Sequence, residues 1–334
     1  MKNSFPLLAI TMGDPAGVGP EIALKALLSP AKPLQSRFII IGNSSCMEKA
    51  ARSLSVSSSL NSITRAEDIR PDCINIFNVK QPELKNFIIG QPQAQCGKAA
   101  YEYIITGINL ALAGSVDAIV TCPINKEALK MAGIPYPGHT EIFADKTHTV
   151  HYSMMFACDN VYVVHVTTHV SLKQAIDMIT EERVLEHTRL LNDALKNLGI
   201  SSPRIAVSGL NPHAGENGLF GNEEQVHICP AIQRAVAEGI NATGPYPPDT
   251  VFMRTFSGEF DGIVSMLHDH GFVALKSRNF DDGVNITLGL PIIRTSVGHG
   301  TAYDIAGKGI ASEKSLIAAL HSARNMVQHK QYPL

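Results

Sequence analysis

Residues 283–309 read GVNITLGLPIIRTSVGHGTAYDIAGKG and join two unlike halves. In the first half, every second residue from Val284 to Ile292 is apolar, which is the pattern of a half-buried strand. Pro291 is expected to break that strand or to place it at a sheet edge. The second half is rich in glycine, with Gly298, Gly300, Gly307 and Gly309. This density favours a loop whose backbone approaches a ligand, and an ordinary glycine-rich turn is the alternative.

The composition limits the class of protein. A length of 334 residues suggests about two domains, and 45% hydrophobic with 17% charged residues is typical of soluble globular proteins. The net charge of -2 argues against non-specific nucleic-acid binding. No apolar run is as long as a membrane span, and the run at residues 6–10 is too short for a signal-peptide core. The sequence therefore predicts neither a nucleic-acid partner nor a membrane partner.

The six cysteines are far apart and include no C-x-x-C pair. This spacing favours reduced thiols in the cytoplasm.

Apolar runs and amphipathic stretches alternate along the chain, which predicts an α/β fold with a mostly parallel sheet and helices on both faces. The strands are expected at residues 7–12, 38–41, 73–79, 117–122, 154–157, 161–166, 204–208 and 263–267. The main helices are expected at residues 45–53, 95–113, 180–199, 223–239 and 313–328. Residues 244–250 are interpreted as a rigid turn.

The first strand leads into the loop GDPAGVG at residues 13–19, and Pro20 and Glu21 then suit the start of a helix. The loop matches neither G-x-G-x-x-G nor a Walker A motif, so a nucleotide motif is not assigned to it. A tight turn between strand and helix remains the alternative.

Three histidines follow predicted strands: His169, His213 and His268. Ligands of an open α/β sheet gather at the carboxyl ends of its strands, where three neutral imidazoles would form a divalent metal site. Each histidine taken alone also fits a hydrogen-bonded loop residue. His270 competes with His268, because residues two apart face the same side of an extended segment.

A second set of residues suits a phosphate or carboxylate ligand: His139, Thr140, Lys276, Asn285 and Arg294. Solvated surface charges are the alternative for Lys276 and Arg294. Asp249 and Asp269 are candidate acid/base or orienting carboxylates, with turn capping as the alternative.

Several long motifs, in order, resemble the 4-hydroxythreonine-4-phosphate dehydrogenase (PdxA) family of pyridoxine biosynthesis. The motifs are TMGDPAGVGPE at 11–21, YPGHTE at 136–141, TTH at 167–169, LNPHAGE at 210–216, PDT at 248–250, HD at 268–269 and GVNIT at 283–287. The segment from His299 to Gly309 is also similar to the nucleotide loop of isopropylmalate dehydrogenases. The resemblance implies two α/β/α domains with a cleft between them. The expected first domain comprises residues 1–130 and 300–334, and residues 131–299 form the second, with the metal ligands and dimer contacts.

By this resemblance, His169, His213 and His268 bind a divalent cation such as Zn, Mg, Co or Mn, with His268 coming from the partner subunit of a homodimer. The substrate set of His139, Thr140, Lys276, Asn285 and Arg294 would hold a phosphorylated substrate. NAD or NADP would lie on His299, Gly300, Thr301 and Asp304. The implied reaction oxidises a secondary alcohol, passes hydride to NAD and releases carbon dioxide from a 3-keto acid. The metal would stabilise the alkoxide and then the enolate.

Two positions depart from the family pattern. The family usually has Asp-His-Gly where this chain has Gly298-His299-Gly300, and His-Asp-Gln-Gly where it has HDHG at 268–271. Related branches act on 4-phospho-D-threonate or 4-phospho-D-erythronate, which residues 217–221 and 247–252 resemble more closely. A dihydrodiol branch acts on unphosphorylated substrates and shares the form SVGHG. A metabolite-binding protein without turnover is the hypothesis from another class.

Overall fold

The computed structural model describes residues 5–80, 84, 86–158, 160–278 and 283–330. The chain forms two compact units. Unit 1 comprises the described residues of Met1–Thr149 and Leu290–Gln328, and unit 2 those of Val150–Gly289 and His329–Leu334. The boundaries expected from the sequence, at 130/131 and 299/300, differ from these positions. Helix α5 (His139–Lys146) and strand β12 (Ile293–Val297) consequently belong to unit 1.

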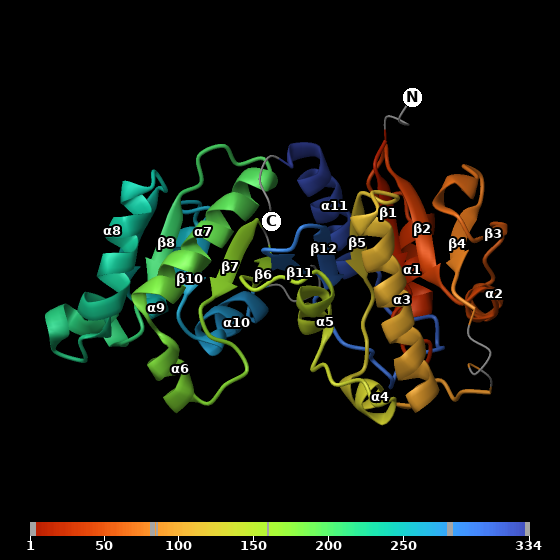
Figure 1. Ribbon diagram of the computed structural model, residues 1–334, viewed down its shortest axis with the longest axis horizontal. Helices are drawn as coiled ribbons and strands as arrows, with labels where there is room; N and C mark the ends of the chain where they lie inside the picture. Colours follow the sequence, from red (N-terminus) through yellow and green to blue (C-terminus); the bar gives the residue numbers. More distant parts are fainter. Residues whose placement is uncertain (1–4, 81–83, 85, 159, 279–282, 331–334) are drawn as a thin grey trace. The chain divides into compact units, whose positions relative to one another are not determined.

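Unit 1 is built on a parallel sheet, whose strands lie in the order β3-β4-β2-β1-β5-β12 (Figure 1). Its other strands are β1 (Leu7–Thr11), β2 (Arg37–Gly42), β3 (Leu60–Ile63), β4 (Ile74–Asn78) and β5 (Ala118–Thr121). Because the strands are parallel, the loops that follow β1, β5 and β12 start from the same edge of the sheet.

Helices cover both faces of this sheet. Arg294 of β12 is in register with Ile119 of β5, and Ile119 packs in one buried cluster with Phe143 of α5. The next residue, Thr295, points to the other face, where its hydroxyl donates a hydrogen bond to Ala319 of α11 (2.9 Å). The helical segments are α1 (Gly19–Leu28), α2 (Ser44–Ser53), η1 (Ala66–Asp68), α3 (Ala94–Leu112), α4 (Lys126–Met131), α5 and α11 (Lys314–His329).

Unit 2 has a mixed sheet in the order β11-β6-β7-β10-β8-β9. The pairs β11·β6 and β6·β7 are antiparallel, whereas β7, β10, β8 and β9 run parallel to one another. The strands are β6 (Ser153–Cys158), β7 (Val161–His165), β8 (Ile205–Ser208), β9 (Ala242–Tyr246), β10 (Gly262–Ser265) and β11 (Val284–Leu288). The parallel strands β7, β10 and β8 thus end at one common edge.

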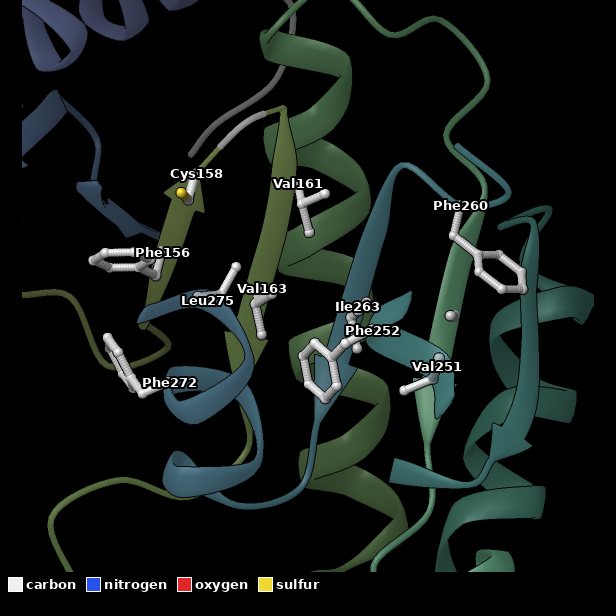
Figure 2. Packing of buried hydrophobic residues seen from close by; sticks show 11 residues of the cluster. Phe156, Cys158, Val161, Val163, Val251, Phe252, Phe260, Ile263, Phe272 and Leu275 are labelled. Carbon is white, nitrogen blue, oxygen red and sulfur yellow. The ribbon is translucent and has the colours of Figure 1, made fainter. Parts of the chain in front are cut away.

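The sheet of unit 2 is also covered on both faces. Figure 2 shows one of them, where Val251 and Phe252 of α9 and Phe272 and Leu275 of α10 pack on the strands. A Cβ at Gly262 would meet Leu191 and Leu195 of α7, so α7 covers the opposite face from Ile263. The helical segments are α6 (Leu172–Met178), α7 (Glu181–Asn197), η2 (Pro212–Gly218), the π-helix η3 (Glu224–Ile228), α8 (Cys229–Ala237), α9 (Pro248–Phe256) and α10 (His268–Lys276).

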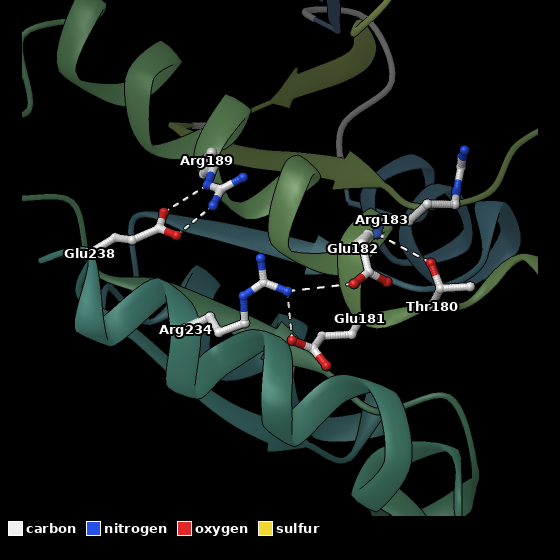
Figure 3. Close-up of polar contacts among 7 residues, drawn as sticks. All are labelled: Thr180, Glu181, Glu182, Arg183, Arg189, Arg234 and Glu238. Atoms are coloured by element: carbon white, nitrogen blue, oxygen red, sulfur yellow. Dashed lines mark hydrogen bonds and ion pairs between the residues drawn. The ribbon is translucent and has the colours of Figure 1, made fainter.

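Exposed ion pairs join α7 to α8 (Figure 3). Arg234 is 2.7 Å from Glu181 and 3.5 Å from Glu182, and Arg189 donates to Glu238 (2.7 Å). Because these charges are in water, the pairs contribute little to stability. Thr180 caps α7, as the sequence predicts, by accepting a hydrogen bond from the Arg183 amide (3.3 Å).

The sequence reading misses several elements, and each omission has a local cause. Residues 244–250, read as a turn, contain the end of β9 and the start of α9, because proline is tolerated in the first turn of a helix. The sequence does not predict α10, because this helix contains Gly271 and glycine disfavours helices. Glycine is needed at this position, since a Cβ there would lie 2.2 Å from His165 Nε2. Pro291 does interrupt the strand, since β11 ends at Leu288 and β12 begins at Ile293. All six cysteines are free, and no helix within the described ranges is long and apolar enough to span a membrane.

Candidate functional site

The loop of residues 298–311, here called the 298–311 loop, lies against the loop that follows β1. The Thr301 carbonyl accepts a hydrogen bond from the Val18 amide (3.0 Å), and the Tyr303 hydroxyl donates to Asp14 Oδ2 (2.8 Å). The Asp14 amide in turn donates to the Pro123 carbonyl after β5 (2.9 Å). The loops after three strands of unit 1 therefore hold one another at the carboxyl edge of the sheet.

The predicted cofactor residues occupy different environments in this loop. Gly300 and Asp304 are exposed, and a Cβ at Gly300 would meet nothing within 4 Å, so its backbone is open to a ligand. Thr301 is buried against Gly17. His299 Nδ1 lies 2.9 Å from the Gly300 carbonyl, and its buried Nε2 has no hydrogen-bond partner among the described residues.

Three residues missed by sequence reasoning anchor the same loop. Asp14 is fully buried, and this burial raises the pKa of its carboxyl group against the opposing hydrogen bonds from Tyr303 and the Ala16 amide. Glu21 accepts from the Gly309 amide (3.3 Å), and Lys25 donates to the Gly309 carbonyl (3.1 Å). The feature of the sequence that could reveal Asp14 is its position between a glycine and a proline in an otherwise apolar loop.

Arg294 is a buried cation, with an exposed fraction of 3%. It donates through Nη2 to the Thr121 hydroxyl (2.7 Å), and its guanidinium lies 5.5 Å from the centre of the Phe143 ring. Burial lowers the pKa of Arg294 to about 9, so the guanidinium remains charged at neutral pH. The surface-charge interpretation is wrong for this residue.

His139 and Thr140 stand at the first turn of α5, where unpaired backbone amides and the helix dipole favour an anion. Burial and then the charge of Arg294 lower the pKa of His139 well below its usual value, so the imidazole is neutral. Its buried Nε2 has no hydrogen-bond partner in the described part of the chain. The structure brings His139 and Arg294 together, with the Glu141 carboxylate of the same helix turn also acting on the guanidinium.

The other two residues of the predicted substrate set belong to unit 2. Lys276 is exposed at the end of α10, with Nζ 5.2 Å from the centre of the Phe272 ring. Asn285 is half-buried in β11, opposite Phe156 of β6.

His169, His213 and His268 follow β7, β8 and β10, as the sequence predicts, and these strands are neighbours in the order β7-β10-β8. The ring centroids of His169 and His268 are 5.6 Å apart. These two side chains help to line a pocket of about 190 Å³, together with Thr167 and Asp269. His213 is not among its lining residues.

The donor chemistry of the histidines fits a metal ion. With Zn–N distances of about 2.1 Å and tetrahedral angles, two imidazole ligands would have centroids about 5 Å apart, close to the His169–His268 distance. His268 Nδ1 is 2.8 Å from Asp269 and His213 Nδ1 is 3.1 Å from Glu216, which leaves both Nε2 atoms for a ligand. Nowhere in the described residues do three or more His, Cys, Asp or Glu side chains form a group that could hold a metal.

Comparisons with known proteins identify the family of this chain. The family model described as pyridoxal phosphate biosynthetic protein PdxA matches residues 34–323. The chain belongs to the PdxA family. A putative D-threonate 4-phosphate dehydrogenase from Oceanobacillus iheyensis is 49% identical, over 97% of this chain and 99% of that protein.

Among solved structures of the PdxA fold, 4-hydroxythreonine-4-phosphate dehydrogenase from Klebsiella pneumoniae is 41% identical, with a TM-score of 0.87 over 98% of this chain and 100% of that one. A terephthalate 1,2-cis-dihydrodiol dehydrogenase from Burkholderia xenovorans LB400 is 28% identical, with a TM-score of 0.69 over 96% and 98%. The predicted family and α/β fold are thereby confirmed.

His165 is a further histidine of this PdxA-family site that sequence reasoning missed. Its ring stacks on Phe272 (4.8 Å) and lies 5.9 Å from His268, and neither ring nitrogen has a partner in the described chain. Burial lowers the pKa of His165 to about 3, so the ring is neutral. The sequence does not single out His165, because this residue is the last one of an otherwise apolar strand. His270, the competitor of His268 in the sequence, is half-buried at the start of α10.

The two candidate carboxylates are exposed. Asp249 lies in the first turn of α9. Asp269 accepts a hydrogen bond from His268, and this bond lowers the pKa of the Asp269 carboxyl group. In this PdxA-family chain, Asp269 is thus placed to orient an imidazole.

Proposed function

We propose that this PdxA-family dehydrogenase oxidises a 4-phosphorylated hydroxy acid, with NAD as hydride acceptor and a divalent cation as cofactor, and that the 3-keto acid formed then loses carbon dioxide. The candidate substrates are D-threonate 4-phosphate, its D-erythronate isomer and 4-hydroxythreonine 4-phosphate. The names of the similar proteins from Oceanobacillus and Klebsiella support the first and third of these. The six free thiols suit a reducing cytoplasm.

The observation that carries this proposal is the buried charge of Arg294. The guanidinium is 3% exposed, it donates to the Thr121 hydroxyl, and the charge of Glu141 favours its charged form. A cation held in place in this way suits an anionic group of a substrate. The neutral His139 imidazole and the first turn of α5 add uncharged donors beside it. A phosphate offers three acceptor oxygens to such a group. Lys276 and Asn285 are assigned to the substrate by the family resemblance alone.

The cofactor is proposed to lie on the 298–311 loop, with contacts to His299, Gly300, Thr301 and Asp304. The open space above Gly300 and the unpartnered His299 Nε2 support this assignment. When bound, NAD accepts the hydride from the substrate alcohol. Asp14, Tyr303, Glu21 and Lys25 hold the loop in place for that contact.

The metal is proposed to bind through Nε2 of His169, His213 and His268. It would act as a Lewis acid on the oxygen that becomes the alkoxide and then the enolate. Asp269 fixes the orientation of the His268 ring, and Glu216 does the same for His213. Asp249 is proposed as an acid/base group, because it is an exposed carboxylate in the first turn of α9.

The enzyme is proposed to be a homodimer with shared sites. Large apolar side chains are exposed in the segments that follow each of the three histidines in the sequence: Val170, Leu172, Ile176, Leu219, Phe220 and Val273. The family resemblance implies that His268 reaches the site from the partner. The 5.6 Å separation of His169 and His268 favours a different grouping, in which these two act together and His213 comes from the other subunit.

The test is steady-state formation of NADH by purified protein, with and without a divalent cation, on each phosphorylated acid and on its dephosphorylated form. Metal-dependent turnover of the phosphorylated acids is expected. Equal rates on both forms would favour the dihydrodiol-type reaction, and absence of turnover with any substrate would favour a binding protein.

A further inference from the structure

The turn that carries His213 is left-handed. Five successive residues, from His213 to Asn217, have positive φ angles between 44° and 79°. Only Gly215 among them adopts this conformation without steric cost, because an L side chain places its Cβ close to the following carbonyl. The surrounding structure must therefore hold the turn in place.

A buried carboxylate lies under this turn. Glu224 has an exposed fraction of 3%, and its Oε1 accepts hydrogen bonds from the backbone amides of Leu210 (2.8 Å) and Asn211 (2.7 Å). Its Oε2 accepts from Asn211 Nδ2 (2.9 Å). One side chain thus fixes the backbone immediately before the left-handed residues.

Two glycines allow the carboxylate to approach so closely. A Cβ at Gly209 would lie 3.1 Å from Glu224 Oε1 and 2.8 Å from the Ala214 Cα. A Cβ at Gly215 would lie 2.7 Å from Glu224 Oε2. The glycines at these positions therefore have a steric role, and they leave room for one specific acidic side chain.

Glu224 begins the π-helix η3, which precedes α8. Single π-turns inside helices are rare and occur often at functional sites. Burial raises the pKa of this carboxyl group, but the hydrogen bonds from Asn211 and from the amides of Asn211 and Leu210 outweigh burial and lower it. The group is an anion at neutral pH.

We infer that Glu224 is a positioning residue for His213: it fixes residues 210 and 211, and through them the left-handed turn of residues 213–217, and thereby aims the imidazole at the metal without touching the ion. This inference rests on the proposed function, in which His213 is a metal ligand. Without the carboxylate, the amides of Leu210 and Asn211 lose their acceptor. The turn then relaxes, and His213 loses both its direction and its contact with Glu216.

The experiment compares Glu224→Ala and Glu224→Gln with the wild type, each freed of metal with a chelator. Zn²⁺ affinity is measured by competition with a chelating dye, and amide hydrogen exchange is measured across residues 209–221. Glu224→Ala is expected to weaken Zn²⁺ binding about 10- to 100-fold, the range of other changes that disturb ligand orientation. It is also expected to speed exchange in this segment alone. Glu224→Gln, which keeps one acceptor oxygen, should lose less.

Glu223→Ala is the matched control. Glu223 is the adjacent carboxylate and contacts the Asn211 side chain (2.7 Å), but no hydrogen bond links it to the 210 and 211 amides. Its Zn²⁺ affinity should stay within about twofold of the wild type, as for ordinary surface changes. Activity at saturating metal gives a second readout, since excess Zn²⁺ should restore the kcat of Glu224→Ala but not that of His213→Ala.

The His213→Ala variant distinguishes a failure of the proposed metal site from a failure of the positioning role of Glu224. If His213→Ala binds Zn²⁺ as tightly as the wild type, His213 is not a ligand and the proposed metal set is wrong. If His213→Ala loses affinity while both Glu224 variants keep it, the positioning role is wrong and the proposed function stands. If Glu224→Ala does not fold, Glu224→Gln decides: unchanged affinity and exchange overturn the inference, and a partial loss of affinity with faster exchange supports it.

Discussion

The 298–311 loop of unit 1 lies where parallel strands end, and so does the edge of unit 2 that carries His169, His213 and His268, here called the histidine edge. A single chain holds the loop in place more completely than it brings the three histidines together. The loop is anchored within its own unit by Asp14, Glu21 and Lys25. At the histidine edge, His169 and His268 meet, while no group of three possible metal ligands forms within the described residues.

This difference follows from what each proposed ligand requires. A loop that is ordered before binding gains affinity, because less conformational freedom is lost on binding, and this suits the proposed dinucleotide. A metal ion needs only a few ligand atoms, and one of them can come from a second copy of the chain. The proposed cofactor half of the site can therefore be tested in one subunit, whereas the proposed metal half must be tested in the proposed dimer.

The largest effect is expected from removing the histidines one at a time. His169→Ala, His213→Ala and His268→Ala should each lower metal-dependent kcat/KM by more than about 100-fold, because even changes to residues behind a metal ligand cost 10- to 100-fold. Circular dichroism should show unchanged folding. Full activity of all three variants in chelator-treated buffer would show that the metal half is assigned to the wrong residues.

Mixing the inactive variants tests which histidine is contributed by the partner subunit. If His268 comes from the partner, His169→Ala mixed with His268→Ala should recover up to about a quarter of wild-type activity, because half of the random dimers carry one complete site. If His213 is the residue contributed by the partner, that mixture stays inactive and His169→Ala mixed with His213→Ala recovers instead. A monomer in sedimentation with undiminished turnover would contradict both groupings.

Arg294→Ala should have the next largest effect. Truncating a buried, hydrogen-bonded charge costs roughly 2–5 kcal/mol, so kcat/KM for the phosphorylated acid should fall at least about 30-fold. The dephosphorylated acid should be affected much less. Arg294→Lys, which keeps the charge but not the paired donors, should recover only part of the loss. Equal losses on both substrates would show that Arg294 does not read the phosphate.

The smallest effects are expected in the anchor of the 298–311 loop. Tyr303→Phe removes one donor from the buried Asp14 carboxylate and should cost about 1–3 kcal/mol of folding stability, with a modest rise in KM for NAD. Thermal unfolding and NAD titration would measure the two effects. A variant with unchanged stability and unchanged KM would show that the loop does not depend on this contact.

The pH dependence of that anchor follows from the sign of the Asp14 shift. Burial raises the folded-state pKa of Asp14, so its contribution to stability is present at acid pH and is lost as the pH rises through that pKa. Asp14→Asn carries no such charge. Its melting temperature relative to the wild type should therefore be highest at neutral pH and should decline on acidification. A constant difference across this range would contradict the assignment.

The sequence alone predicts those features that depend on hydrophobic periodicity and on the order of motifs along the chain. Strand alternation placed the edges that carry His169, His213 and His268, and the motifs identified the family. Interactions between distant residues were not accessible in this way: Tyr303 reaches Asp14 across 289 positions. The role of Glu224 depends on a left-handed turn that no propensity predicts, because ordinary residues there adopt a conformation they disfavour.

The division of unit 1 into two sequence segments has a consequence for how the chain folds. Strand β5 cannot complete its pairing until β12 has been synthesised, since Ala118 pairs with Ile293. Unit 2 lies almost wholly in the single stretch Val150–Gly289, so it can assemble during synthesis while β5 still lacks one edge partner. Closing so long an intervening segment is entropically slow, and a pre-folded unit 2 shortens the effective loop. The 298–311 loop, which follows β12, is thus among the last parts of the molecule to form.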